Sequence, residues 1–487
     1  FSRMLTWSLP WLFLLLILSF SFPTFAYTIL HFSDMHFDPE YNIDGDRNRM
    51  CHLNDNMTSL LEAATNPRLG PYGDYKCDSP AALIAFAVRE ARRLVPAPDL
   101  VVWTGDNIPH EVDFKQPDPT RDMEYVHRVL AYTTSQVYGV FNSTSTILPV
   151  FGNHDYAPPD QFEPNSTLYD YALQLWQFPI RTHLDNEATF RRGGFYKYLL
   201  SSGTVLVLNT NLYYQYNFAV DNFTEKADPA GQFAFIEREL RAAAACQPGQ
   251  GCRQLVHIVA HIAPGAFERS PNITWLRPEY NKRLVGLIAE YADNIGWLLF
   301  GHHHTDTFHI VRDPDGEPVQ LLLMAPAVTP WKMGLEGGGS NNPAFRVYDV
   351  DERTGAYRKI RTYYADVTLL NSGVPGVGFR LEYEMKDAYS LAEGITARTM
   401  DQLIDRMRDS DSVFMQYYGY NSVGFNVTRP DPHFRAAHLC ALSHADLDDY
   451  FVCLEDAPPR ERTASLAEQR TRALLTVAAF VFSLLLL

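Results

Sequence analysis

The sequence predicts an α/β fold with a small helical C-terminal subdomain, and three observations support this. Short apolar runs rich in β-branched residues recur, each of strand length and each bounded by turn-forming residues. Segments with apolar residues at helical spacing lie between several of these runs, and such alternation is typical of helices packed around a sheet. After about Gly378 the strand-like runs stop and helical spacing continues.

The expected strands are of two kinds. Five of them run directly into a polar cluster, namely Tyr27–Phe32, Leu100–Trp103, Ile147–Phe151, Leu255–Ala260 and Ile295–Phe300. Three further strands are expected at Val205–Leu208, Leu321–Met324 and Phe345–Val350. Ligand sites in α/β folds collect at the carboxyl ends of strands, so the five polar clusters are the candidates for a functional site.

The expected helices show one apolar face each. Residues 81–95 follow Ser79, which we expect to be the N-cap, and Pro80, which suits the first helical position. Its apolar face consists of Leu83, Ile84, Ala87, Val88 and Ala91. A second helix is expected at Ala234–Ala245. In the C-terminal part, the helical face consists of Met400, Leu403, Ile404 and Met407, which predicts a packed core there.

Composition limits the partners. The chain has 487 residues, enough for one large domain and a smaller one, and 46% of them are hydrophobic. Its 41 Lys and Arg residues against 57 Asp and Glu residues give a formal net charge of −16. Because proteins that grip nucleic acid polymers are usually basic, this balance argues against such a partner. A small anion can still be held where a metal ion supplies positive charge.

The N-terminal segment has the pattern of a secretory signal. Arg3 precedes an apolar run, Leu9–Phe20, which is short for a membrane span. Thr24 and Ala26 then stand at positions −3 and −1 of a cleavage point. We therefore expect residues 1–26 to be a signal peptide that takes no part in the fold.

The C-terminal segment has the pattern of a lipid-anchor signal. Arg470 and Arg472 precede a run of fifteen apolar residues, Ala473–Leu487, and small residues lie upstream at 464–467. This arrangement predicts a stalk and a tail that is cleaved and replaced by a glycolipid at 461–487. An uncleaved hydrophobic tail is the alternative.

Cysteines and sequons point to the same compartment. Six cysteines in a secreted chain favour disulfide bonds. Fifteen connectivities are formally possible, and proximity in the sequence favours one of them, which consists of three pairs. These pairs are Cys51–Cys77, Cys246–Cys252 and Cys440–Cys453. No CxxC spacing occurs, which argues against a cysteine zinc site. Glycosylation sequons occur at Asn56, Asn142, Asn165, Asn222, Asn272 and Asn426.

The five polar clusters contain residues that bind metals. They are Asp34 and His36; Asp106 after Gly105; Asn153, His154 and Asp155 after Gly152; His261; and His302 to His304 after Gly301. In an extended segment, residues i and i+2 point to the same side and residue i+1 points to the other. We therefore expect His302 and His304 to face the cluster and His303 to point away. Two other histidines, His31 and His257, lie inside strands and are expected in the core.

In order, the set D-x-H, G-D, G-N-H-D, H and G-H-x-H resembles the calcineurin-like metallophosphoesterase superfamily, whose members bind two metals. Longer strings resemble the acid sphingomyelinase-like phosphodiesterases, and GHHHTD with the apolar tail is most like the lipid-anchored form of that family. These strings are GNHDYAPPDQF (152–162), LNTNLYY (208–214), FGHHHTDTF (300–308), APAVTPW (325–331) and NNPAFRVYDVD (341–351). The resemblance implies a four-layer αββα metallophosphoesterase sandwich at 27–378 and a helical subdomain at 379–460.

The resemblance also implies the ligands of two metal ions. The first ion is held by Asp34, His36, Asp106 and His304, and the second by Asp106, Asn153, His261 and His302. Asp106 would bridge the two. Because imidazoles outnumber carboxylates, we expect two zinc ions per chain rather than magnesium or calcium. Two such ions clamp the attacking and leaving oxygens of a phosphoryl displacement and acidify a bridging water.

Three residues are expected to assist the reaction. His154 is next to a ligand, where it would stabilise phosphate oxygens or protonate the leaving alkoxide. His110, four residues after Asp106, is the other candidate acid, with a plain surface-loop histidine as the alternative. Asp155 is expected to orient His154 through a hydrogen bond.

Together these patterns predict an extracellular, cell-surface enzyme. We expect a monomer that hydrolyses phosphodiester or phosphoanhydride bonds in small nucleotide or phosphocholine-type substrates. Asp34 lies eight residues after Ala26, which leaves no room for the lipid-loosening saposin-like module of acid sphingomyelinase, so sphingomyelin is the alternative substrate. A membrane-organising or receptor-associated binding protein with slight catalysis, and a phosphomonoesterase or polyphosphatase on the same metal pair, remain open.

Overall fold

The structure is a computed structural model that describes residues 26–53, 68–110, 118–247, 249–335, 337–425 and 427–458. Residues 1–25 of the expected signal peptide, the expected anchor segment, Asn56 and Asn426 lie outside the described residues. None of the helices in the described part combines the length and the apolar character needed to cross a bilayer.

The first of two six-stranded sheets has the order β12-β11-β10-β1-β2-β3. Its strands are β1 (Ala26–Phe32), β2 (Leu100–Trp103), β3 (Thr146–Pro149), β10 (Ala344–Asp351), β11 (Tyr357–Tyr364) and β12 (Arg380–Glu384). Strands β1, β2 and β3 run parallel, whereas β10, β11 and β12 continue the sheet in antiparallel pairing. The carboxyl ends of β1, β2 and β3 therefore meet at one edge of the sheet.

The second sheet has the order β4-β5-β6-β7-β9-β8. Its strands are β4 (Tyr196–Leu199), β5 (Gly203–Val207), β6 (Leu255–Val259), β7 (Ile295–Phe300), β8 (Thr307–Arg312) and β9 (Pro318–Met324). The four central strands are parallel, and the two edge strands, β4 and β8, are antiparallel to their neighbours. Parallel central strands buried on both faces read as continuous apolar runs, as these do.

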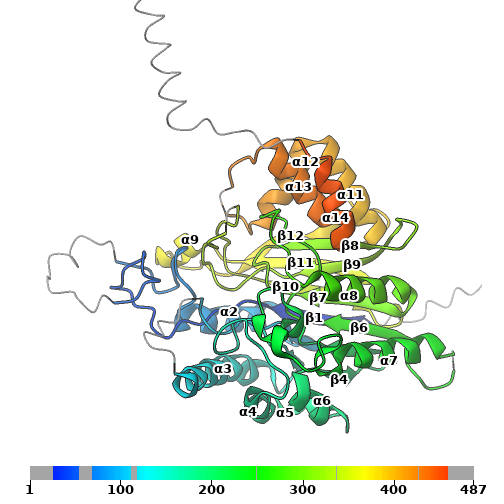
Figure 1. Ribbon diagram of the computed structural model, residues 1–487. Helices are drawn as coiled ribbons and strands as arrows, with labels where there is room; N and C mark the ends of the chain where they lie inside the picture. The colour runs from blue at the N-terminus through cyan, green and yellow to red at the C-terminus, as the bar shows by residue number, and fades with distance from the viewer. Residues whose placement is uncertain are drawn as a thin grey trace, which may run out of the picture.

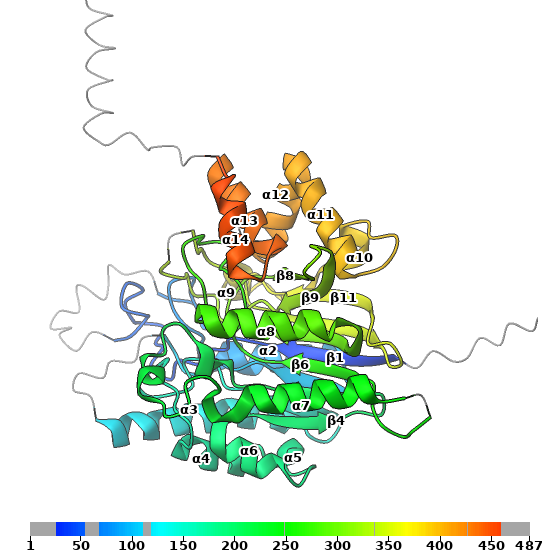
Figure 2. The same ribbon diagram turned by 45° about the vertical axis from the view of Figure 1, so that its right-hand side comes forward.

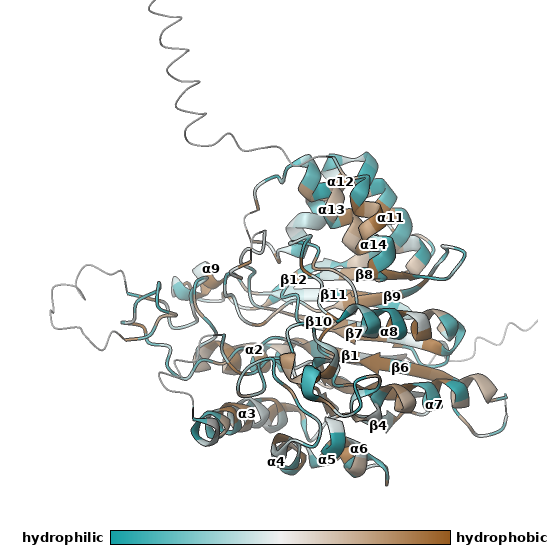
Figure 3. Cartoon of the chain, viewed as in Figure 1, coloured by the Kyte–Doolittle hydropathy of each residue, from teal (hydrophilic) through white to brown (hydrophobic). Residues whose placement is uncertain are grey.

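Helices cover the outer faces of both sheets. Figures 1 and 2 show α2 (Ala81–Leu94) and α3 (Pro119–Phe141) on one side of the two strand layers and α7 (Gln232–Ala245) and α8 (Pro278–Glu290) on the other. Three shorter helices lie beyond β3, namely α4 (Thr167–Leu175), α5 (Gln177–Ile180) and α6 (Asn186–Gly193). The predicted four-layer α/β arrangement is confirmed. In Figure 3 the central strands are hydrophobic and the visible side of α8 is largely hydrophilic.

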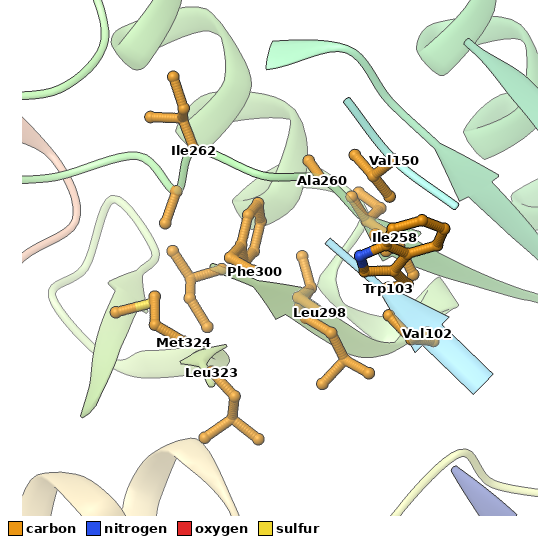
Figure 4. Close-up of a cluster of buried hydrophobic side chains, with 14 of the residues drawn as sticks. Val102, Trp103, Val150, Ile258, Ala260, Ile262, Leu298, Phe300, Leu323 and Met324 are labelled. Carbon is orange, nitrogen blue, oxygen red and sulfur yellow. The ribbon is translucent and has the colours of Figure 1, made fainter. Parts of the chain in front are cut away.

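The core lies between the sheets. Figure 4 shows side chains of β2, such as Val102 and Trp103, with side chains of β6, β7 and β9, such as Ile258, Leu298 and Leu323, in one buried cluster. Burying a large apolar side chain stabilises the fold by about 1.5–3 kcal/mol, so this cluster fixes the two sheets against each other. The polar loops at the strand ends thus stand on a rigid support.

The C-terminal helices follow β11 in the chain. They are α9 (Val367–Asn371), α10 (Met385–Ala388), α11 (Ala397–Asp409), α12 (Asp411–Asn421), α13 (Pro432–Ser443) and α14 (Leu447–Glu455). Helix α11 packs on β8 and β9, α13 packs on β8, and α10 packs on β11 and β12 (Figure 2). The predicted helical face of α11, with Met400, Leu403, Ile404 and Met407, is buried as expected.

Most expected elements are present, with one local error. All eight expected strands form, and the sequence missed β4, β8, β11 and β12. The apolar face predicted for α2 is buried, but the predicted Ser79 cap is wrong. Pro80 occupies the N-cap position, no side chain caps the helix, and the Ser79 hydroxyl has no partner. The Ser79 N–H instead donates to the carbonyl of His36, which ties the helix start to the first polar cluster.

The disulfides follow proximity in the sequence. Cys51–Cys77, Cys246–Cys252 and Cys440–Cys453 are all bonded, so the predicted pairs are confirmed. The four sequon asparagines in the described part, Asn142, Asn165, Asn222 and Asn272, are all exposed. Their glycosylation stays a prediction.

Candidate metal centre

Loops that follow five parallel strands bring the predicted ligands into one cleft. The loops after β1, β2 and β3 come from the first sheet, and those after β6 and β7 come from the second. The cleft holds a cavity of about 250 Å³. Its lining consists of Asp106, His110, Asn153, His154, Asp160, Tyr214, Trp275, His302, His304, Trp331 and Met333 to Leu335. Asp34, His36 and His261 lie beneath, fully buried.

Two glycines let the loops approach one another closely. A Cβ on Gly105 would lie 2.2 Å from the backbone nitrogen of Gly152, and a Cβ on Gly152 would lie 2.1 Å from Asp106 Oδ1. Real Cβ atoms never come this close, so any larger residue would push the β2 and β3 loops apart. The glycines before the polar clusters are therefore requirements of the cleft.

Nitrogen and oxygen atoms converge at the centre of the cleft. His36 Nε2 lies 3.2 Å from His304 Nε2 and 3.4 Å from Asp106 Oδ2. His261 Nε2 lies 3.2 Å from the same Asp106 oxygen, 3.0 Å from Asn153 Oδ1 and 3.2 Å from His302 Nδ1. One carboxylate oxygen of Asp106 thus lies between two groups of predicted ligands.

The deepest carboxylate closes one side of the cleft. Asp34 Oδ1 lies 3.5 Å from His304 Nε2. The same carboxylate accepts hydrogen bonds from the Ser33 hydroxyl and from the backbone N–H of His302 at 3.1 Å. Asp34 therefore joins the loop after β1 to the loop after β7.

Hydrogen bonds behind the rings fix which nitrogen faces inward. His36 Nδ1 donates to the carbonyl of Ile108 at 2.7 Å, and His261 Nδ1 donates to the carbonyl of Thr104 at 2.6 Å. In the neutral form each ring carries its one proton on Nδ1, so Nε2 then presents a lone pair to the cleft. Lone pairs this close to each other and to a carboxylate oxygen, at 3.2–3.4 Å, repel unless metal ions or protons lie among them. The donor set therefore fits divalent metal ions.

The backbone at the ligands is unusual. Five of the predicted ligands have a positive φ angle, although none of them is glycine: Asp34 (51°), His36 (39°), Asp106 (56°), His302 (72°) and His304 (61°). This conformation turns alternate side chains of each loop toward the cleft. It is unfavourable for residues with a Cβ and persists only where surrounding contacts enforce it.

Without metal ions the cleft holds protons. Burial alone would raise the pKa of Asp106, but the charges of His261 and His154 outweigh it and hold this pKa well below its usual range. Burial likewise disfavours charge on His261, yet the Asp106 carboxylate raises the His261 pKa to about 9. Burial raises the pKa of Asp34 to about 7. A metal ion that enters the cleft must therefore displace protons.

His110 is part of the cleft and not a surface histidine. Its ring stacks between His36 and Trp331, with ring centroids 3.8 Å from each. Asp78, which is fully buried, accepts from the His110 backbone N–H at 2.7 Å and from Nδ1 at 2.9 Å. The hydrogen bond on Nδ1 leaves Nε2 as the free ring nitrogen. No sequence pattern pointed to Asp78, which lies 32 positions before His110.

His154 also lines the cavity, but its expected partner is elsewhere. Its ring lies 4.7 Å from that of His110, and its Nδ1 is buried without a partner. The predicted hydrogen bond from Asp155 is wrong. The Asp155 carboxylate accepts instead from the backbone N–H groups of Asp106, Asn107 and Gly152 at 2.7–3.1 Å. Asp155 thus joins the β2 and β3 loops and leaves His154 free.

The middle histidine of the triplet belongs to a separate cluster. His303 Nδ1 lies 2.8 Å from Glu268 Oε2, and the Trp275 indole N–H donates to His303 Nε2 at 2.9 Å. An indole nitrogen can only donate, so the His303 proton sits on Nδ1 and faces Glu268. Glu268, His303 and His309 have metal-ligand spacing, but this proton makes their arrangement a hydrogen-bonded core cluster. As expected, His303 points away from the cleft.

His31 and His257 are buried in the core as expected, although His257 Nε2 has no hydrogen-bond partner. His31 lies within hydrogen-bond distance of Thr104 and Tyr348, and His257 Nδ1 accepts from the Trp297 backbone N–H. The sequence missed Asp160, which accepts from Asn153 Nδ2 at 2.8 Å and so turns the amide oxygen of Asn153 into the cleft. Asp160 lies seven positions after Asn153, and no spacing rule predicts the contact.

Comparison with known proteins identifies the family. Residues 27–306 match the family model described as calcineurin-like phosphoesterase, and residues 317–458 match the model described as acid sphingomyelin phosphodiesterase C-terminal region. The human protein named acid sphingomyelinase-like phosphodiesterase 3b is 34% identical over 434 residues, which cover 87% of this chain and 89% of that protein. The chain belongs to the acid sphingomyelinase-like phosphodiesterase family.

Two further relatives support this assignment. The human protein named cyclic GMP-AMP phosphodiesterase SMPDL3A is 33% identical over 433 residues, covering 87% of this chain and 89% of that protein. Sphingomyelinase phosphodiesterase C of Dictyostelium discoideum is 27% identical over 435 residues, covering 87% and 92%. Members of this family hydrolyse phosphodiester bonds, and the phosphoesterase domain implies a pair of divalent metal ions. The chain is therefore a metal-dependent hydrolase of phosphodiester bonds.

Proposed function

We propose that this protein is an extracellular phosphodiesterase that uses two zinc ions to hydrolyse small nucleotide or phosphocholine-type diesters. One observation carries the proposal: side chains from five strand ends bring imidazole nitrogens and carboxylate and amide oxygens within 3.0–3.5 Å of one another. Such an arrangement is stable only around cations. Imidazole-rich donor sets favour zinc over magnesium or calcium.

Two ligand groups share Asp106. Asp34, His36, Asp106 and His304 would hold one ion, and Asp106, Asn153, His261 and His302 would hold the other. When bound, the ions supply a nucleophilic hydroxide at neutral pH and neutralise charge on the phosphoryl oxygens. Asp160 and the backbone carbonyls of Ile108 and Thr104 keep the ligands in the orientation that this chemistry needs.

Two histidines are placed to handle the leaving group. His110 and His154 both line the cavity above the ligands, and neither is needed as a ligand in the proposed scheme. Asp78 holds the His110 ring with Nε2 free, so a ring that takes up a second proton, on Nε2, would be suited to pass that proton to the departing oxygen. His154, next to Asn153, is suited to stabilise the phosphoryl oxygens or to serve as the acid itself.

The cavity favours a small substrate with a flat or apolar group. Tyr214, Trp275 and Trp331 form aromatic walls, and Met333 and Leu335 add apolar surface. Aromatic walls around a few polar groups are typical of sites for small organic ligands. One relative is named for cyclic GMP-AMP hydrolysis, which supports a nucleotide substrate for this chain.

The location rests on the disulfides and on the sequence. Three disulfide bonds are typical of proteins outside the cytosol. We propose attachment to the cell surface through a glycolipid that replaces residues 473–487. Phosphatidylinositol-specific phospholipase C should release the protein from intact cells. Protein that stays on the membrane and still carries residues 473–487 in its C-terminal peptide would exclude this anchor.

A substrate panel tests the proposed chemistry. Purified mature protein should hydrolyse bis-p-nitrophenyl phosphate, lose this activity with a chelator and regain it with zinc. ATP, CDP-choline, a cyclic dinucleotide and micellar sphingomyelin then rank the substrate classes. Turnover that survives complete removal of metal would refute the proposed mechanism, and preference for micellar sphingomyelin would refute the proposed substrate class.

A further inference from the structure

A buried asparagine joins the C-terminal helices to the loop that carries two proposed metal ligands. Asn421 is the last residue of α12 and is fully buried. Its carbonyl accepts from the backbone N–H of Asp306 at 3.1 Å, and its Nδ2 donates to the carbonyl of Asp306 at 3.3 Å. Asn421 thus forms hydrogen bonds with both the backbone N–H and the backbone carbonyl of Asp306, the last residue of the His302–Asp306 loop.

The same side chain reaches a second loop. Asn421 Nδ2 donates to Glu268 Oε1 at 3.0 Å, and Asn421 Oδ1 accepts from Arg269 Nε at 2.7 Å. Both partners are buried, with Arg269 3% exposed. Arg269 also donates to the carbonyl of Gly338 at 3.4 Å, within the segment that follows Leu335 of the cavity lining. Asn421 therefore contacts two loops directly and is linked to a third through Arg269.

Glu268 extends this contact to the middle of the histidine triplet. Its carboxylate accepts from His303 Nδ1 at 2.8 Å and from the Thr305 hydroxyl at 2.5 Å. His303 in turn accepts from Trp275, whose ring packs against His302 with centroids 4.3 Å apart. A continuous chain of buried contacts runs from α12 to a proposed metal ligand.

The loop needs such support because its backbone is strained. His302 and His304 both have φ in the left-handed region, at 72° and 61°. Residues with a Cβ leave this region when nothing holds them, and their side chains then point elsewhere. Contacts at 303, 305 and 306 act on the positions between and after these two ligands.

We propose that Asn421 is a positioning residue that holds His302 and His304 in the metal-binding conformation. The C-terminal helices are then a working part of the metal centre, although they contribute no ligand. The inference rests on the proposed metal centre and goes beyond it, because it assigns the ligand geometry to a contact more than a hundred residues along the chain.

A second buried asparagine provides a matched control. Asn281 of α8 is 1% exposed, donates to the carbonyl of Ala445 at 3.0 Å and accepts from the Gly265 N–H at 2.8 Å. It also joins the C-terminal helices to the catalytic part of the chain, but it does not touch the His302–Asp306 loop. Loss of either amide leaves buried polar groups without partners, so both should lower thermal stability.

Zinc affinity separates positioning from general stability. The full chain with Asn421→Ala, Glu268→Gln or Asn281→Ala is titrated with zinc against a competing chelator, and thermal unfolding is measured on the same samples. Asn421→Ala and Glu268→Gln should weaken zinc binding about 10–100-fold, the usual effect of residues that orient metal ligands. Asn281→Ala should destabilise the fold but change zinc affinity less than about twofold, well below that range.

Three outcomes would overturn the proposal. Asn421→Ala protein that folds and binds zinc with wild-type affinity would exclude a positioning role. Equal loss of affinity in Asn281→Ala would show that reduced stability alone is responsible. Should Asn421→Ala fail to fold, Glu268→Gln decides between the same two readings. A wild-type protein that binds no divalent ion would refute the proposed metal centre itself, and this inference with it.

Discussion

His302 and His304 face the cleft while His303, between them, lies in the core behind it, and the three differ only in what surrounds them. In the cleft, ring nitrogens such as His261 Nε2 meet lone pairs of other groups. Behind the cleft, both nitrogens of His303 have a matching hydrogen-bond partner: Nδ1 donates to Glu268, and Nε2 accepts from Trp275. The lesson is that unsatisfied lone pairs mark a metal site better than the presence of histidine does.

The largest effect should follow loss of the carboxylate shared by the two ligand groups. Asp106→Asn removes the charge between His36 and His261, and phosphodiester hydrolysis should fall on the order of 10³-fold or more. Initial rates and metal content by elemental analysis measure this. The control is Asp349→Asn on β10, which changes a partly exposed carboxylate paired with Arg361 of β11. This variant should keep full activity. Comparable rates for both variants would mean that Asp106 does not bridge.

A slightly smaller effect should identify the cleft histidines that carry protons. His110→Ala and His154→Ala should each lower the rate with an alkyl leaving group on the order of 10²–10⁴-fold, because a general acid is lost, while metals are retained. A nitrophenolate leaving group should restore whichever variant lost the acid. His183→Ala, on a surface loop, is the control. If neither variant is rescued, both histidines stabilise charge and the acid is another group or water.

The histidine triplet itself can be separated by metal stoichiometry. At saturating zinc, His302→Ala and His304→Ala should each bind fewer ions than the wild type, whereas His303→Ala should bind the full number. His303→Ala should instead lower the free energy of unfolding by about 3 kcal/mol, because Glu268 is left buried without its partner. Elemental analysis and denaturant unfolding measure the two effects. A reduced metal content in His303→Ala at saturation would contradict the division of the triplet.

The smallest effect concerns pH. In the metal-free protein the pKa of His261 is about 9, so its ring is protonated at neutral pH and a metal ion must expel that proton. Affinity should rise about tenfold per pH unit between pH 7 and 9, and more steeply below pH 7, where Asp34 is protonated as well. Titration calorimetry in buffers of different ionisation enthalpy counts the released protons. A pH-independent affinity over this range would contradict the arrangement of Asp106 and His261.

The Glu268–His303 cluster behind the cleft should respond to acid only at a much lower pH than the cleft does. Burial favours the neutral form of Glu268, but His303 outweighs it and holds the Glu268 pKa well below its usual range. A depressed folded-state pKa contributes stability above the unfolded value of about 4.5 and loses it as pH falls further. The Glu268–His303 contact should therefore stay intact over pH 7–9, while the cleft releases protons.

Much of the fold and of the cleft could be predicted from the sequence. Each central strand is an apolar run, and each ligand follows directly at its carboxyl end, so the order of the motifs already predicts where Asp34, Asp106 and His261 meet. Alternation along a short loop was enough to separate His303 from its neighbours. These features are local, and local patterns can be read without coordinates.

The supporting contacts could not be predicted, because they join distant parts of the chain. Asp78 holds His110, Glu268 holds His303 and Asn421 holds Asp306 across large sequence separations. Asp155 shows the converse error, since adjacency to His154 suggested a contact that the fold does not make. Its carboxylate turns toward the N–H groups of another loop, which outnumber the single donor beside it.

The left-handed backbone at the ligands sets a limit on protein engineering. Each strained residue costs on the order of 1–2 kcal/mol, and glycine at the same position would not incur that cost. Replacing His302 or His304 by glycine should therefore give a sturdier protein than replacing it by alanine, although both are inactive. Selection for thermal stability alone would push these positions toward glycine and away from catalysis. Catalytic activity and thermal stability therefore place opposite demands on these positions. Substitutions that stabilise the enzyme without loss of activity have to be sought elsewhere in the chain.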